Sequence, residues 1–189
     1  MKRAIILTFG LCLAFTACIE KKPYQRAERE NPVSTRLADM VVDEDRLLET
    51  AGVESTAYRT LHRTHREEVY TYLAQALIAD PEDLYRAALI LNRAEPANAA
   101  EACLMAHFLA EAAAAEGFAS AKQLAAQSMD RYLVLTGKSQ LYGTQYYNDS
   151  EGRLRLFPVD PNVSDSERAL YNVSPLDSLK ARLGRGEPD

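Results

Sequence analysis

Cysteine is scarce in this chain: its 189 residues include three, Cys12, Cys18 and Cys103. Cys12 lies inside an apolar N-terminal run and Cys18 directly follows that run, so Cys103 is the only cysteine in the remainder. A single thiol cannot form an internal disulfide, which excludes the class of small disulfide-stapled domains. Because Cys103 lies in an alanine-rich segment, we expect a small buried hydrophobic side chain, with a reactive thiol as the alternative.

The sequence also lacks a surplus of positive charge. Lysine and arginine number 22 against 27 aspartates and glutamates, which gives a net charge of −5 at pH 7. Nucleic-acid binding and electrostatic attachment to an anionic membrane surface both need a basic face. We therefore expect no nucleic-acid partner.

The motifs of several enzyme classes are missing as well. No Gly-x-Ser-x-Gly nucleophile elbow occurs, and none of the eight glycines belongs to a phosphate-binding loop. His62, His65 and Glu68 could lie along one helix face, but the histidine spacing is not that of the zinc metalloprotease helix. No other cluster of histidine or cysteine accompanies them. We predict neither a metal site nor a cofactor.

An export signal stands at the N-terminus. Lys2 and Arg3 precede an uncharged apolar run over residues 4–17. The run is shorter than the roughly 20 residues of a transmembrane helix and is typical of a signal peptide. It ends in the letters FTAC (residues 15–18), which resemble the bacterial lipobox except that phenylalanine stands where leucine is usual. The resemblance implies cleavage after residue 17 and lipidation of Cys18; a plain secretory signal cut at the same place is the alternative.

Lipid on Cys18 would anchor the protein to a membrane of the bacterial cell envelope, since several acyl chains hold a membrane stably where one chain does not. Isoleucine, and not aspartate, follows the cysteine. In a Gram-negative cell the resemblance therefore implies the periplasmic face of the outer membrane. Residues 18–33 are rich in charge and offer little to bury, so they predict a flexible tether.

Residues 34–183 predict a single helical domain, followed by a tail over 184–189. Hydrophobic residues make up 47% of the chain, enough for a core. Apolar side chains recur at helical spacing over 34–50, 55–79, 80–93, 99–116 and 119–136. The last two segments meet at Gly117, carry small residues and are similar to the helix pairs of tetratricopeptide repeats. A solenoid needs about three repeats, so we predict a mainly α helical bundle with tetratricopeptide-like pairs.

The composition changes after this bundle. Residues 142–159 predict a β-hairpin, because two segments of strand character flank a turn-like stretch. An isolated two-stranded hairpin is marginal, so we expect it to pack on the helices. Ser164 and Glu167 have the spacing of a capping box for a short helix, and a second short helix is expected from residue 174 to 183.

The most distinctive stretch combines DRYL (residues 130–133) with QLYGTQ (residues 140–145). It resembles an uncharacterised family of bacterial domains that join an alanine-rich helix, a DR-x-L segment and a Q-x-[YF]-GTQ segment to a hairpin and a proline-containing tail. The resemblance covers about residues 82–182. It implies a fold and supplies no mechanism.

Adjacent helical residues point about 100° apart, so Asp130 and Arg131 are not expected to pair with each other. Each would need another partner if buried. One interpretation is a polar network that locks the hairpin against the preceding helix. The other is a small polar pocket that binds a ligand. His107 is expected to be a hydrogen-bonded core histidine or a member of the same network. The candidate ligand-binding residues are Asp130, Arg131, Gln140, Tyr142, Thr144, Gln145 and His107.

Two functional hypotheses follow. The first is a membrane-anchored envelope lipoprotein that binds another protein or a cell-wall component and has no catalytic role. The alternative is an enzyme or small-molecule sensor built around the polar pocket. The first rests on the export signal and the missing catalytic motifs, and the second on the two polar segments.

Overall fold

The computed structural model describes residues 31–95 and 99–184. The predicted leader, the lipidation site Cys18 and the tether up to residue 30 lie outside the described residues. So do the predicted helix break at residues 96–98 and residues 185–189 of the predicted tail. Gly184, the first residue of that predicted tail, is helical instead.

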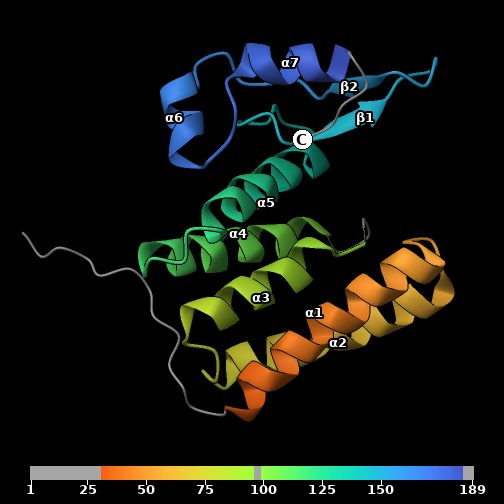
Figure 1. Ribbon diagram of the computed structural model, residues 1–189, viewed down its shortest axis with the longest axis vertical. Helices are drawn as coiled ribbons and strands as arrows, with labels where there is room; N and C mark the ends of the chain where they lie inside the picture. Colours follow the sequence, from red (N-terminus) through yellow and green to blue (C-terminus); the bar gives the residue numbers. More distant parts are fainter. Residues whose placement is uncertain (1–30, 96–98, 185–189) are drawn as a thin grey trace, which may run out of the picture.

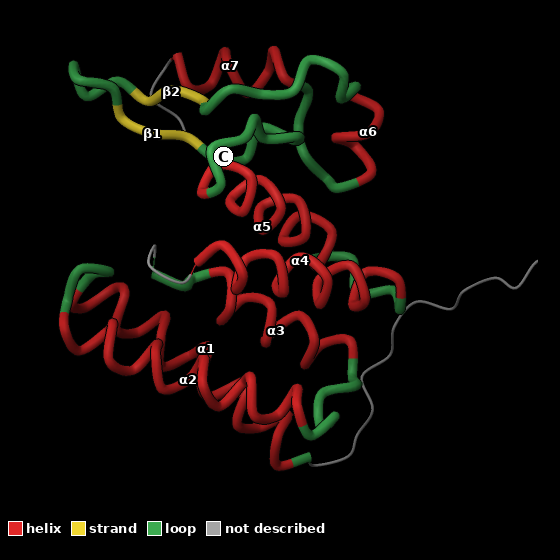
Figure 2. The backbone as a smooth tube through the Cα atoms, turned by 180° about the vertical axis from the view of Figure 1, so that it is seen from behind, coloured by secondary structure: helices red, strands yellow, loops and turns green. Residues whose placement is uncertain are grey.

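Five helices form an elongated stack (Figures 1 and 2). The α1–α2 pair lies at one end, α3 and α4 follow, and α5 leads to the C-terminal unit at the other end. Among the described residues, none of the helices combines the length and the apolar character that crossing a membrane would require. The helices are α1 (Pro32–Ala51), α2 (Thr56–Ala74), α3 (Pro81–Asn92), α4 (Ala99–Ala115) and α5 (Ala121–Leu135).

The C-terminal unit consists of a small β-hairpin and two short helices that follow α5. Strand β1 (Tyr146–Asn148) pairs antiparallel with β2 (Leu154–Leu156), with Tyr147 opposite Arg155. Helices α6 (Asp165–Leu170) and α7 (Leu176–Gly184) follow. The predicted fold class, mainly α with a C-terminal β-hairpin, is confirmed.

Local signals explain where these helices begin. Asn31 caps α1 by accepting a hydrogen bond from the N–H of Val33 at 3.0 Å, so α1 begins at Pro32, two residues before the predicted start. Asp80 caps α3 in the same way. The capping box predicted at Ser164 and Glu167 is present at the start of α6.

The predicted end of α2 was wrong. The helix ends at Ala74, not at residue 79, because Ala76 adopts a left-handed conformation with φ of 54° and turns the chain. Leu77 is consequently exposed, although its spacing placed it on the apolar face. The buried residues of α2 are Tyr58, His62, His65 and Val69.

The described residues bury two separate hydrophobic clusters. The larger cluster contains side chains from all five helices, α1 through α5. Most of the α4 side chains in it are alanines. Small side chains let α4 lie close to both α3 and α5. The smaller cluster seats the C-terminal unit on the far side of α5 and includes Ala126, Tyr142, Val173 and Leu179. Helix α5 therefore lies between the two cores.

Candidate functional site

Asp130 lies near the end of α5, is fully buried and organises the segment that follows the helix. Its carboxylate accepts hydrogen bonds from the four consecutive backbone N–H groups of residues 141–144, at 2.7 to 3.2 Å. The hydroxyl of Thr144 donates to it at 2.9 Å. Backbone N–H groups converging on one point form an anion-binding nest, and in this protein the anion is the carboxylate of Asp130.

Gln140 is also fully buried and ties the same segment to the hairpin. Its Oε1 accepts from the N–H of Gln145 at 2.8 Å, and its Nε2 donates to the carbonyls of Gln145 and Phe157 at 2.9 and 3.0 Å. The amide thus satisfies one acceptor and two donors internally.

Arg168 holds the opposite side of the segment, and sequence reasoning missed it. From α6 its buried guanidinium donates to the carbonyls of Tyr142 at 3.2 Å, Leu141 at 3.3 Å and Val163 at 2.6 Å. Asp130 therefore binds the N–H groups of the segment while Arg168 binds its carbonyls. In the sequence, Arg168 stands out only because it follows the capping-box residue Glu167. That position does not reveal which carbonyl groups the guanidinium binds.

The remaining candidates do not converge on one open cleft. Arg131 points away from Asp130 and donates to the carbonyls of Asn92 and Ala94 at the end of α3. The prediction that Asp130 and Arg131 would not pair is confirmed. His107 is buried, and its Nδ1 lies 3.0 Å from the carbonyl oxygen of Ala125, not from Asp130.

Tyr142 and Gln145 lie at the margin of the polar network. The ring of Tyr142 packs on the ring of Tyr171 with 4.6 Å between centroids, and burial raises the pKa of its hydroxyl far above the usual range. The side-chain amide of Gln145 donates to the carbonyl of Gln127 at 3.4 Å and to the hydroxyl of Thr144 at 3.3 Å. This geometry favours the network that locks the hairpin onto α5 over a pocket lined by free polar groups.

A second buried polar cluster joins α1 and α2. His62 and His65 do come together, but on Glu44 and not on Glu68, which pairs with Arg36. Their Nδ1 atoms lie 3.0 and 3.2 Å from Oε1 of Glu44, and since a carboxylate only accepts, each Nδ1–H donates. Among the residues that the structure describes, no group of His, Cys, Asp and Glu is arranged to hold a metal ion.

The charge of Glu44 is stabilised although the side chain is buried. Burial by itself raises the pKa of the carboxyl group, but hydrogen bonds from His62 and His65 and the charge of Arg93 outweigh it and lower the pKa to about 2. Nη1 of Arg93 donates to Oε2 at 3.2 Å. Sequence carried one signal for this residue: Glu44 continues the apolar stripe of α1 set by Leu37 and Met40.

Cys103 is fully buried in α4. Burial raises the pKa of its thiol to about 11, so the thiol stays protonated at neutral pH. The expectation of a small buried hydrophobic side chain is confirmed.

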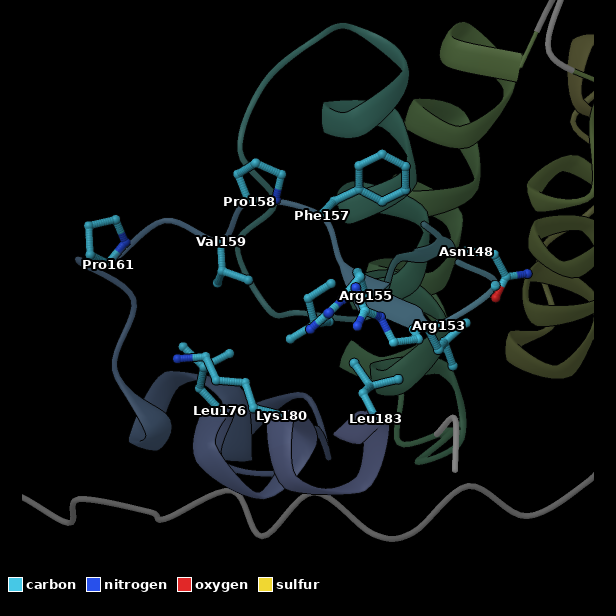
Figure 3. Close-up of a pocket in the computed structure, with 13 residues that line it drawn as sticks. Asn148, Arg153, Arg155, Phe157, Pro158, Val159, Pro161, Leu176, Lys180 and Leu183 are labelled. Carbon is cyan, nitrogen blue, oxygen red and sulfur yellow. The ribbon is translucent and has the colours of Figure 1, made fainter. Parts of the chain in front are cut away.

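A hollow of about 970 Å³ lies between β2 and α7 (Figure 3). One wall is the extended chain over residues 152–159, and the other is the face of α7 that carries Leu176, Lys180 and Leu183. Figure 3 shows the side chains of these three residues on the side of α7 that faces β2 and the chain after it, with Leu183 nearest to Arg153 and Arg155. We call this hollow the β2–α7 groove. No motif predicted it, because its two walls are separated in sequence and meet only in the folded chain.

All charged residues that line the β2–α7 groove are basic: Arg153, Arg155 and Lys180. Both arginines pair with Asp149 in the hairpin turn, each at 3.0 Å from Oδ2. Nζ of Lys180 lies 3.8 Å from the carboxylate of exposed Asp177, a weak surface pair. Nη1 of Arg153 also pairs with Glu151 at 2.8 Å. The charged side chains in the lining itself are therefore all basic, and their acidic partners lie just outside it.

Comparisons with protein-family models, with curated proteins and with solved structures give no match to this chain. The resemblance to bacterial domains with DR-x-L and Q-x-[YF]-GTQ segments therefore stays a prediction.

Proposed function

We propose that this protein is a lipid-anchored lipoprotein of the bacterial cell envelope whose folded domain is a protein-binding module. The observation that carries the binding role is the β2–α7 groove, a hollow of about 970 Å³ lined by apolar and basic side chains. Its volume is in the upper part of the range of about 300–1,000 Å³ typical of ligand sites. The proposed location rests on the apolar leader that ends at Cys18.

The groove supports binding better than the polar segments support catalysis. Asp130 and Gln140 are buried, and their polar atoms are engaged by the protein's own backbone. A catalytic or sensing group must reach a substrate, and these two groups would have to release internal hydrogen bonds first. The alternative of an enzyme or small-molecule sensor therefore gains no support from this geometry.

Lipidation is tested by mass spectrometry of the protein extracted from bacterial membranes. We expect an N-terminal Cys18 that carries acyl chains, and a Cys18→Ser variant that lacks them and leaves the membrane fraction. An unmodified N-terminus, or the leader still attached in cytosolic material, would contradict the proposed location.

Binding is tested by photo-crosslinking in cells, with a photoreactive amino acid placed at single surface positions. Leu183 in the groove and the exposed Met105 on α4 are suitable positions. A binding module is expected to give a discrete protein adduct from at least one position. If no position on the described surface crosslinks a protein, the proposed binding function is wrong.

A further inference from the structure

We infer that the β2–α7 groove binds an extended, acidic segment of a partner protein, which adds to the hairpin as a third strand beside β2. This inference rests on the proposed binding function and names the chemistry of the partner. Three independent features carry it: the hydrogen-bonding edge of β2, the arrangement of α7 and the sign of the lining charges.

The first feature is the open edge of β2. The hydrogen bonds that flank the ladder run from the N–H of Asp149 to the carbonyl of Arg153 at 2.9 Å and from the N–H of Phe157 to the carbonyl of Gln145 at 3.2 Å. Hydrogen bonding alternates along an antiparallel pair, so Arg153, Arg155 and Phe157 direct their backbone groups toward β1. The N–H and C=O groups of residues 154 and 156 then point to the opposite edge.

That opposite edge faces the groove. Figures 1 and 2 both place β2 between β1 and α7, and residues 152–159 line the hollow without interruption. Within residues 31–95 and 99–184, the backbone groups of residues 154 and 156 have no partner on this edge, whereas Pro158 and Asp160 bond the backbone of Gln140. An unpaired strand edge is a ready template for another extended chain, whose main-chain groups complete the ladder. The groove thus presents backbone donors and acceptors as well as side chains.

The second feature is the face that α7 turns to the groove. Leu176, Lys180 and Leu183 follow one another at spacings of four and three residues, so they share one helix face. Leu179 lies beside this face, three residues after Leu176, and is buried in the smaller core, which fixes the orientation of α7. Two leucines flanking a lysine favour a ligand that alternates apolar and acidic side chains, as an extended strand can.

The third feature is charge. Arg153, Arg155 and Lys180 line the groove, and no carboxylate among the described residues does. Complementary charge attracts an acidic segment and disfavours a basic one. An anionic lipid or detergent would also satisfy the charge and the leucines, but it would leave the edge of β2 unused, and the test separates the two.

The probe is a fluorescein-labelled hexapeptide that alternates glutamate and valine, titrated with the full-length protein and followed by fluorescence anisotropy. We expect saturable binding that Lys180→Glu weakens about tenfold or more, since the variant reverses a lining charge. The matched control Lys122→Glu makes the same change at an exposed position on α5 and is expected to bind like the unmodified protein. A peptide with lysine in place of glutamate is expected not to bind.

Backbone pairing is tested on the peptide, which leaves the folding of the protein unaffected. Successive N–H groups of a strand point to opposite edges, so methylating alternate peptide nitrogens blocks one edge at a time. We expect one methylated set to abolish binding and the other to bind within about twofold of the parent peptide. In ¹⁵N spectra, the amides of Leu154 and Leu156 should shift more than the amide of Arg155.

Several outcomes would overturn the inference: no binding, equal binding of the lysine peptide, or equal effects of the two methylated sets. Equal effects together with competition by dodecyl sulfate below its micelle concentration would assign the groove to anionic amphiphiles. The photo-crosslinking experiment distinguishes a failure of the strand-binding inference from a failure of the proposed binding function. Adducts at Met105 but none at Leu183 would leave the protein a binding module whose site is not the groove.

Discussion

At the scale of single residues, Asp130 is the centre of the C-terminal unit. Its carboxylate is buried, and its hydrogen bonds come from the N–H groups of residues 141–144 and the hydroxyl of Thr144. A buried charge is costly unless such bonds replace water. The same bonds fix the path of the chain between α5 and β1.

We predict that Asp130→Asn lowers the free energy of unfolding by about 3 kcal/mol, because the amide replaces an acceptor with a donor and leaves backbone N–H groups unsatisfied. Urea titration followed by circular dichroism measures this. The control is Asp177→Asn, which changes an exposed carboxylate and should alter stability by less than about 0.5 kcal/mol. Equal stability of the two variants would mean that Asp130 does not hold the segment.

Gly143 has two reasons to be glycine. Its φ is +90°, and a Cβ atom built on it would lie 3.2 Å from Cδ1 of Leu179. Gly152 in the hairpin turn has a similar φ of +76°, but a Cβ atom there meets nothing within 4 Å. Comparing these two glycines separates the cost of the backbone conformation from the cost of placing a methyl group against Leu179.

We predict that both Gly143→Ala and Gly152→Ala destabilise the protein, each by about 1 kcal/mol for the left-handed conformation. Gly143→Ala should cost more than Gly152→Ala, since the side chain of Leu179 must shift away from the added methyl group. Melting temperatures of the two variants provide the measurement. A smaller loss for Gly143→Ala would show that the contact between Leu179 and residue 143 does not limit the space there.

At the scale of elements, Glu44 connects three helices. From α1 it binds His62 and His65 of α2, and it binds Arg93 at the end of α3. The surroundings of Glu44 lower the pKa of its carboxyl group from 4.5 to about 2, so the native state favours the ionised carboxylate more than the unfolded chain does.

The sign of the pH effect follows. Below pH 4.5 the unfolded chain takes up a proton at Glu44 while the folded protein does not, so the contribution of Glu44 is complete above that pH and is lost as the pH falls toward 2. We predict a loss on the order of 3 kcal/mol over this interval. It is measured by urea unfolding at a series of pH values.

The Glu44→Gln variant should lack this part of the acid sensitivity, whereas Glu49→Gln on the exposed face of α1 should retain it. Parallel loss of stability with acid in the Glu44→Gln variant and in the unmodified protein would contradict the role given to Glu44.

Several helix limits could be predicted from the sequence. The caps at Asp80 and Ser164 and the end of α4 before Gly117 are local signals, because each depends on residues within one turn of the chain. The end of α2 was not predictable in this way. Its apolar pattern continued past Ala74, and the left-handed turn at Ala76 interrupts it without a glycine or proline.

At the scale of the whole molecule, the stack places its two ends far apart. The start of α1 lies at one end of the long axis, and the β2–α7 groove lies at the other (Figure 1). A lipid anchor that precedes α1 would attach the domain at the end far from the groove, which would leave the groove open to a partner. Helix α5 contributes side chains to both hydrophobic cores. The groove belongs to the C-terminal unit, and this unit packs through α5 on the helices of the larger core.

The sequence by itself determined the mainly helical fold class, the hairpin, most helix limits and the burial of Cys103, because these depend on periodicity and on capping between near neighbours. Only the tertiary structure decided what the buried polar groups bind. Glu44 meets histidines 18 and 21 positions away, and Arg168 reaches carbonyls 26 and 27 positions away. The β2–α7 groove is of the same kind, since a strand edge and a helix face become one surface only when the smaller core seats α7 beside β2.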